Sequence, residues 1–336
     1  MSAPYYADGT VTLHHGDALA VLRTLPDASV NACVTSPPYF GLRDYGVEGQ
    51  YGGEASPAEY VETMRALFAE VRRVLADDGT LWLNLGDSYS VGGVARHNTN
   101  QPNQNRDGSA DNTFADFGAR FSPGRESHGI PAKNLLGIPW RTAFALQDDG
   151  WILRAEIIWA KRNCMPEAVT DRVSRAHEQV FMFTKSPRYW YDADAIREDS
   201  APEQQAHNER YAKVYDAQAN RASTTGQPGN VNSAGIHPRP GKAGRNARSV
   251  WSISAQPFSA AHFAVMPQAL AERAILAGCK PGGTVLDPFS GSGTTGLAAT
   301  KHGRRYVGID LSADYLDLSL RTRFAQPGLD LSGGVA

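Results

Sequence analysis

The chain has 336 residues and a formal net charge of −2; 41% of its residues are hydrophobic and 20% are charged. This composition is typical of a globular protein with a sizeable core, built as one large domain with insertions or as two small domains. We expect no membrane span, because no apolar run approaches ~20 residues, and no signal peptide. Three cysteines without paired or metal-like spacing favour a cytoplasmic protein without disulfides or a metal site.

Predicted strands and helices alternate along the chain. Short apolar runs that end at turn residues predict seven strands, at 11–14, 30–35, 80–85, 151–160, 179–184, 284–286 and 305–309. Apolar residues at helical spacing predict helices at 18–25, 57–75, 138–147, 267–277, 294–302 and 313–324. This alternation predicts an α/β fold, with a doubly wound, mostly parallel sheet that helices cover.

Two long segments interrupt the alternation. The first, at 89–133, is rich in Gly, Asn, Gln, Arg and Ser, and we expect a lid or a DNA-contact loop there. The second, at 192–248, has no acidic residue after Asp216, and its basic residues are typical of a loop that follows phosphates. The alternative for the second segment is a solvated surface loop. These basic residues are Arg221, Arg239, Lys242, Arg245 and Arg248.

A glycine-rich turn follows the predicted strand at 284–286. Its glycines allow the backbone to approach a ligand closely, and the helix behind it presents free N–H groups to a negative group. Asp310 closes the next strand, where a carboxylate can accept bonds from ribose hydroxyls. The pattern predicts a nucleoside cofactor; the alternative is a tight turn with Asp310 as a helix cap. The predicted cofactor-binding residues of the turn are Asp287, Pro288, Phe289, Gly291, Ser292, Gly293, Thr294 and Thr295.

A second rigid turn, Ser36-Pro37-Pro38-Tyr39, follows the buried strand at 30–35. Its prolines fix φ, so the hydroxyl of Ser36 and the carbonyl of Pro37 point in set directions and can hold the N–H groups of an exocyclic amine. Tyr39 offers a flat face on which a base can stack. Taken alone, these four residues are also compatible with a rigid turn that has no catalytic role.

Together these motifs resemble those of the amino-methyltransferases that act on DNA, in the β-class arrangement where the catalytic turn precedes the cofactor turn. TSPPY at 35–39 matches the catalytic motif and DPFSGSGTT at 287–295 the cofactor motif, while Gly16-Asp17 matches a short motif near the cofactor adenine. Residues 262–267 resemble the cofactor-clasping segment, with Met266 where an aromatic residue is common, and 170–178 resembles the segment that faces the base.

The resemblance implies a single catalytic domain over 1–336: a seven-stranded Rossmann-like sheet with circularly permuted motif order that binds S-adenosyl-L-methionine. It implies catalysis by Ser36, Pro37, Pro38 and Tyr39 on a base flipped out of double-stranded DNA. It adds the cofactor contacts Asp17, Thr35, His262, Phe263 and Ala264. It places target recognition at 192–248 and DNA contacts at Arg172, His177, Arg221, Arg239, Lys242, Arg245 and Arg248.

Serine at the first position of the turn favours N4 of cytosine as the target in this family, with N6 of adenine as the alternative. Methylation at carbon 5 is excluded, because it needs a cysteine after a proline and none of the three cysteines follows one. We expect a monomer or homodimer. A cognate restriction endonuclease in the same system, a phage origin and a solitary regulatory role are all compatible with these residues.

Three other hypotheses are weaker. The same fold acting on RNA or on a protein amide usually places an Asn-Pro-Pro-Tyr turn after the cofactor motif, whereas the order here is the reverse. A catalytically inactive DNA-binding module conflicts with two intact motifs. A nicotinamide dehydrogenase would match only the glycine spacing and would leave the TSPPY turn at 35–39 without a role.

Overall fold

The computed structural model describes residues 3–42, 49–90, 130–164, 166–199, 244–256 and 266–324. The chain divides into two compact units, Met1–Trp190 with Ser249–Ala336, and Tyr191–Arg248. The elements are, in chain order, β1 (Tyr6–Ala7), β2 (Val11–His15), α1 (Ala18–Leu22), β3 (Val30–Thr35), α2 (Pro57–Val74), β4 (Leu75–Leu85), α4 (Ile138–Asp148), β5 (Ile152–Ala160), β6 (His177–Thr184), β7 (Val250–Ser252), α6 (Gln268–Gly278), β8 (Thr284–Asp287), α7 (Thr294–Lys301), β9 (Arg305–Asp310), α8 (Ala313–Ser319) and η1 (Leu320–Phe324).

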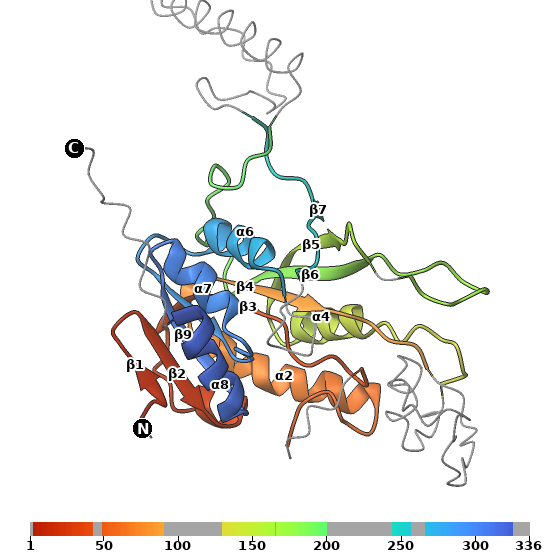
Figure 1. Cartoon of the computed structure of the whole chain (residues 1–336), viewed down its shortest axis with the longest axis horizontal. Helices are drawn as coiled ribbons and strands as arrows, with labels where there is room; N and C mark the ends of the chain where they lie inside the picture. The colour runs from red at the N-terminus through yellow and green to blue at the C-terminus, as the bar shows by residue number, and fades with distance from the viewer. Residues whose placement is uncertain are drawn as a thin grey trace, which may run out of the picture. The chain divides into compact units, whose positions relative to one another are not determined.

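The first unit is built on one sheet, whose described residues form nine strands in the order β1-β2-β9-β8-β3-β4-β6-β5-β7 (Figure 1). Five of the eight pairings are parallel, and only the β1–β2, β4–β6 and β5–β6 pairs are antiparallel. The predicted mostly parallel α/β fold is therefore confirmed. All seven predicted strands are present, and the prediction missed two short edge strands, β1 and β7, which are too short to show an apolar alternation.

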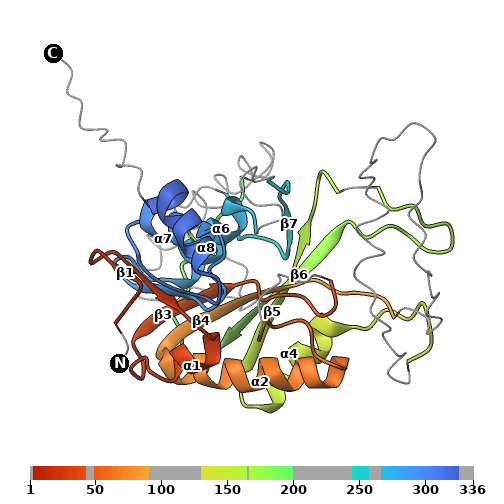
Figure 2. The same cartoon turned by 60° about the horizontal axis from the view of Figure 1, so that its bottom comes forward.

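Helices cover both faces of this sheet. Figure 2 shows α1, α2 and α4 on one face and α6, α7 and α8 on the other, as expected for a doubly wound fold. The longest of these helices, α2, begins with Ser56 as its N-cap and Pro57 in its first turn. It buries one stripe of side chains at helical spacing, namely Tyr60, Met64, Leu67, Phe68, Val71 and Val74. No helix of the described residues is long and apolar enough to cross a membrane.

Several element ends differ from the prediction. The helix predicted at 18–25 ends at Leu22, as α1. The helix predicted at 57–75 ends at Val74, and the strand predicted at 80–85 begins earlier, at Leu75, which pairs with Val30. Residues 77–79, Asp-Asp-Gly, are typical of a turn, yet they lie within β4. Pairing in the sheet outweighs the local turn signal there. The last helix was expected to be continuous over 313–324, but it passes at Leu320 into a π-helical turn, η1.

The second unit is described at 191–199 and 244–248. Its two segments are joined by reciprocal backbone hydrogen bonds between Glu198 and Arg245 of 2.9 and 2.8 Å. The carboxylate of Glu198 accepts from Arg248 at 2.8 Å and from Arg245 at 3.4 Å. Two of the arginines predicted to contact DNA therefore share one acidic partner within this unit.

Candidate active site

The two predicted turns lie at one edge of the sheet because they follow parallel strands. The Ser-Pro-Pro-Tyr turn follows β3 and the glycine-rich turn follows β8, and these strands are neighbours, with Ala32 opposite Val285 and Cys33 opposite Leu286. Ligands of open α/β sheets bind outside the carboxyl ends of such strands. The sheet thus brings together two motifs that lie about 250 positions apart in the sequence.

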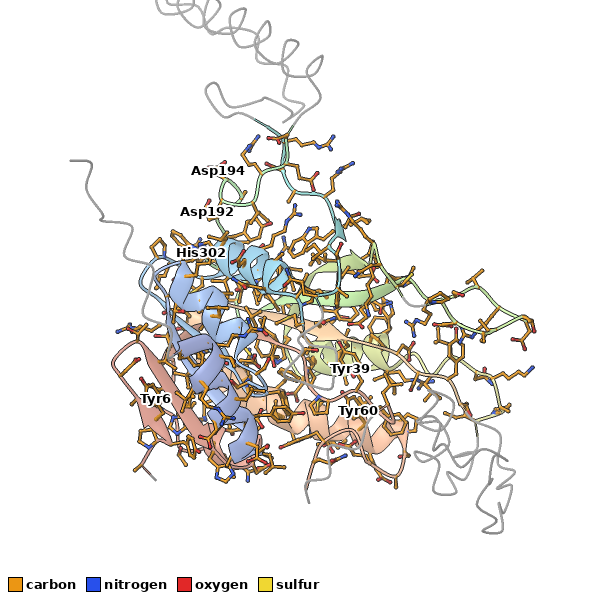
Figure 3. The ribbon with its side chains drawn as sticks, viewed as in Figure 1. Tyr6, Tyr39, Tyr60, Asp192, Asp194 and His302 are labelled. Atoms are coloured by element: carbon orange, nitrogen blue, oxygen red, sulfur yellow. The ribbon has the colours of Figure 1, made fainter. Side chains whose placement is uncertain are left out.

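The Ser-Pro-Pro-Tyr turn is held by hydrogen bonds from the elements around it. Tyr60 of α2 donates from its hydroxyl to the carbonyl of Pro38 over 2.9 Å, and Figure 3 labels Tyr60 beside Tyr39. The hydroxyl of Tyr39 lies 3.0 Å from Oγ of Ser36 and 2.7 Å from Oε2 of Glu178. Ser36 and Tyr39 are both half-buried. The turn is therefore fixed at its main chain and at both of its polar side chains.

The ring of Tyr39 lies directly against Gly86, the residue after β4. A Cβ atom at Gly86 would be 2.5 Å from Cε2 of Tyr39, so this close approach requires glycine. Burial raises the pKa of the Tyr39 hydroxyl well above its usual value, and the nearby Glu178 carboxylate raises it further. Tyr39 therefore keeps its proton at neutral pH and can donate it in a hydrogen bond.

Three polar residues around Tyr39 carry a second set of bonds. Asn84 donates from Nδ2 to Oε2 of Glu178 over 3.1 Å, and Lys161 donates from Nζ to Oε1 of Glu178 over 2.5 Å. The sequence placed Glu178 in the base-facing segment without giving it a role, and it gave no role to Asn84 or Lys161. The sequence signal that could have identified this cluster is the asparagine inside the apolar strand TLWLNL at 80–85, which is buried in the structure.

The glycine-rich turn contains two glycines in the left-handed region of backbone conformation. Gly291 and Gly293 have φ of +50° and +79°, values that favour glycine. Asp310, at the end of β9, accepts from the backbone N–H of Gly291 over 2.7 Å and from that of Ser312 over 2.9 Å. Burial raises the pKa of Asp310. One oxygen of this carboxylate thus supports the glycine-rich turn and the other supports the start of α8, and each keeps a second lone pair for a ligand.

The turn also contains buried hydroxyls without a partner. Among the described residues, Oγ of Ser292 and Oγ1 of Thr294 are buried and make no hydrogen bond. Thr294 begins α7, whose N-cap Gly293 supplies no side-chain bond to the free N–H groups. Buried hydroxyls and helix N–H groups that share one turn fit a polar or negatively charged ligand group. These residues therefore suit the predicted nucleoside cofactor.

Asp17 and Phe289 are joined by a residue that the sequence reasoning missed. Tyr51 donates from its hydroxyl to Oδ2 of Asp17 over 2.7 Å, and its ring contacts that of Phe289 edge-on, with centroids 5.2 Å apart. The other oxygen of Asp17 caps α1 through the N–H of Ala20. Burial raises the pKa of Tyr51, and so do the hydrogen bond to Asp17 and the negative charge of Asp17. Tyr51 therefore keeps its proton.

The remaining predicted residues are spread more widely. Arg172 stacks on the ring of Tyr89 at 4.1 Å and donates to Glu167, while His177 is the first residue of β6, opposite Ala160. No group of acidic, histidine or cysteine side chains that could hold a metal exists among the described residues. Six predicted residues lie outside the described residues: the cofactor contacts His262, Phe263 and Ala264 and the DNA contacts Arg221, Arg239 and Lys242.

Comparisons with known proteins agree with this geometry. The N6/N4 family of DNA methylases matches residues 30–321. The type II methyltransferase M.Cfr9I of Citrobacter freundii is 41% identical over 319 residues, which cover 95% of this chain and 89% of that protein.

Two solved structures have a similar fold. The cytosine-N4-specific PvuII DNA methyltransferase aligns with a TM-score of 0.61 at 19% identity, over 97% of this chain and 90% of that one. TTHA0409 of Thermus thermophilus, a putative DNA modification methylase, aligns with a TM-score of 0.52 at 24% identity, over 93% and 94% of the two chains. TTHA0409 was solved in complex with S-adenosyl-L-methionine.

Proposed function

The chain belongs to the N6/N4 DNA methylase family, and we propose that it methylates the N4 amino group of a cytosine in double-stranded DNA. The observation that carries the choice of base is Ser36, a half-buried hydroxyl at the first position of the catalytic turn. In the family that the motifs resemble, serine at this position is commoner in enzymes that act on N4 of cytosine. N6 of adenine is the alternative outcome.

The residues of the glycine-rich turn would hold S-adenosyl-L-methionine. Ser292, Thr294 and the N-terminus of α7 offer hydrogen bonds to its charged end. Asp310 and Asp17 offer carboxylates to the hydroxyl and amino groups of its nucleoside. The cofactor supplies an electrophilic methyl group when it is bound. His262, Phe263 and Ala264 remain predicted contacts of the same ligand.

The catalytic turn would hold and aim the target amino group. Its nitrogen is a poor nucleophile, because its lone pair is delocalised into the ring of the base. Oγ of Ser36 and the carbonyl oxygen of Pro37 would accept its two N–H bonds, which draws the nitrogen toward sp³ geometry and points its lone pair at the methyl group. Since the prolines fix these acceptors in advance, little reorganisation is needed during the reaction.

The target base must leave the duplex to reach this turn. The second unit, Tyr191–Arg248, would supply target recognition, and Arg245 and Arg248 would anchor phosphates that position the protein on DNA. Arg172 and His177 would contact DNA from the catalytic unit. Because the relative M.Cfr9I is a type II methyltransferase, we further propose that this chain protects DNA against a restriction endonuclease of the same system.

The choice of base is tested by identifying the product. The purified protein is incubated with S-adenosyl-L-methionine and unmethylated genomic DNA made by whole-genome amplification, and the DNA is digested to nucleosides for mass spectrometry. We expect N4-methylcytosine, formed about 100-fold more slowly or slower still by the Ser36→Ala variant. N6-methyladenine would overturn the choice of cytosine and keep the mechanism. No methylated nucleoside, with cofactor binding intact, would point to an RNA or protein substrate.

A further inference from the structure

Glu178 lies 139 positions after the Ser-Pro-Pro-Tyr turn, yet its carboxylate is bonded to the last residue of that turn. It is the second residue of β6 and pairs with Trp159 of β5, and the residue after it, Gln179, pairs with β5 on one side and β4 on the other. Its side chain is 14% exposed and that of Lys161, its ion-pair partner, is 25% exposed. Lys161 thus places a positive charge 2.5 Å from Oε1 of Glu178, in a site that is largely shielded from solvent.

The directions of the hydroxyl hydrogens follow from the distances. Tyr39 has one hydroxyl hydrogen and three acceptors within reach of it, Oε2 of Glu178 at 2.7 Å, Oγ of Ser36 at 3.0 Å and Oδ1 of Asn84 at 3.2 Å. The bond to the charged carboxylate is shorter and stronger, so the hydrogen points to Glu178. The hydroxyl oxygen of Tyr39 is then the acceptor for Ser36, 3.0 Å away. Ser36 thus donates to Tyr39 and keeps its lone pairs for a substrate N–H.

We propose that Glu178 is the final proton acceptor of the methyl transfer, reached from the target amino group through Ser36 and Tyr39, and that Lys161 holds its carboxylate in position. This inference rests on the proposed function, because it assumes that the substrate is an amine held by Ser36. It extends that function by assigning an acceptor for the proton that the methylated nitrogen must release.

The step balances in atoms and electrons. The lone pair of the amino nitrogen forms the new N–C bond, and the electron pair of the broken C–S bond stays on sulfur. The nitrogen releases one proton to Oγ of Ser36 while Ser36 passes its own hydrogen to the Tyr39 oxygen and Tyr39 passes its hydrogen to Oε2 of Glu178. Glu178 ends as a neutral carboxylic acid, which loses the proton to water to restore the starting state.

Two features of the site suit this transfer. The raised pKa of Tyr39 means that its hydroxyl is protonated before the reaction, so it can pass one hydrogen on as it receives another. Asn84 donates to the same Glu178 oxygen that accepts from Tyr39 and also to the carbonyl of Gln179, each over 3.1 Å. It therefore keeps that oxygen turned toward Tyr39.

Glu178→Gln and Tyr39→Phe test the relay without removing either side chain. In Glu178→Gln the new amide oxygen can still accept from Tyr39, and in Tyr39→Phe the ring can still pack on Gly86, but neither variant can carry the proton to a carboxylate. Glu272→Gln is the matched control, because Glu272 is also bonded to a lysine, Lys301 at 2.7 Å, and is 20% exposed. The assay is single-turnover methyl transfer to unmethylated amplified genomic DNA, with cofactor and DNA binding measured separately.

We expect each of the two variants to slow transfer by about 100-fold, the usual contribution of general base catalysis, with binding of cofactor and DNA within threefold of wild type. Since both lie on one path, the double variant should be no slower than the slower single variant. Glu272→Gln should stay within twofold. Should Glu178→Gln fail to fold, Tyr39→Phe decides alone.

Transfer by a folded Tyr39→Phe or Glu178→Gln variant within threefold of wild type would overturn the relay while the proposed function stands. The relay would also be overturned if the rate loss of the double variant equalled the product of the two single-variant losses. A wild-type protein that methylates no amino group of DNA would instead overturn the proposed function, and the relay with it.

Discussion

Thr35 donates from Oγ1 to Oδ1 of Asp287 over 2.7 Å, and this buried bond joins the last residue of the strand before the catalytic turn to the last residue of the strand before the cofactor turn. Asp287 also accepts from the backbone N–H of Phe289 over 3.1 Å on the same oxygen. The two turns are therefore fixed relative to each other by side chains as well as by the sheet, so a displacement of one turn is transmitted to the other.

Thr35→Val removes this link with little change in shape. Thr35 is 0% exposed, so the variant leaves a buried acceptor with one donor fewer. We expect the free energy of unfolding to fall by about 1–3 kcal/mol and the affinity for S-adenosyl-L-methionine to weaken, as measured by urea denaturation and calorimetry. A variant with unchanged stability and affinity would show that the sheet alone fixes the two turns.

Asp287→Asn tests the electrostatics of the same carboxyl group. Burial raises the pKa of Asp287 to about 6, above the ~3.9 of an unfolded aspartate. The folded protein therefore binds more protons than the unfolded chain between these values, so this group makes the free energy of unfolding fall as pH rises from about 4 to about 6. Asparagine does not titrate there, and its amide oxygen can accept the same two bonds.

Urea denaturation at several pH values measures the free energy of unfolding of both proteins. The value for Asp287→Asn minus the value for the wild type should increase by on the order of 2 kcal/mol between pH 4 and pH 7. The difference between variant and wild type should be flat above pH 7. A difference that is independent of pH, or that favours the wild type increasingly as pH rises, would contradict the raised pKa.

Gly86→Ala tests the packing of the Tyr39 ring. The added Cβ would lie 2.5 Å from Cε2 of Tyr39, so the ring must move away from its bonds to Ser36 and Glu178. We expect methyl transfer to slow by about 100-fold or more and stability to fall by about 1–3 kcal/mol. Gly53→Ala is the control, because a Cβ at Gly53 meets nothing within 4 Å. Equal rates for the two variants would mean that the position of this ring is unimportant.

Tyr51→Phe separates the two contacts that Tyr51 makes. The variant keeps the ring against Phe289 and loses the hydroxyl that donates to Asp17 over 2.7 Å. Since a hydrogen bond to a charged group contributes about 1.5–3 kcal/mol, the carboxylate of Asp17 should become less well positioned. We expect the Kd for S-adenosyl-L-methionine to rise by about 3- to 10-fold, by calorimetry, with transfer at saturating cofactor nearly unchanged. An unchanged Kd would remove Asp17 from the cofactor site.

The sequence predicted most of the fold because its local patterns agree with the final pairings. The seven predicted strands are the seven inner or longer strands of the sheet, where apolar runs are long enough to identify. The predicted start of the strand at 80–85 was wrong, because β4 begins at Leu75, whose pairing with Val30 is a contact between distant parts of the chain. The break at Leu320 was missed because the helical pattern of the sequence continues through it.

The site was predicted in part. Both turns and the membership of the DNA methylase family follow from contiguous motifs, and the family is confirmed. The bonds from Glu178 and Tyr51 depend on which side chains the register and the loops bring together, which no contiguous motif encodes. The target base and the residues that contact DNA stay predictions, because they depend on a partner that a single chain does not contain.

Single-turnover methyl transfer by Ser36→Ala tests most directly the claim that the Ser-Pro-Pro-Tyr turn acts on the amino group. Wild type and variant are loaded with saturating S-adenosyl-L-methionine, mixed with unmethylated amplified genomic DNA, and followed by nucleoside mass spectrometry. We predict cofactor and DNA binding within threefold of wild type and a transfer rate reduced by about 100-fold or more. A variant that transfers methyl groups within threefold of the wild-type rate would contradict the assignment of Ser36.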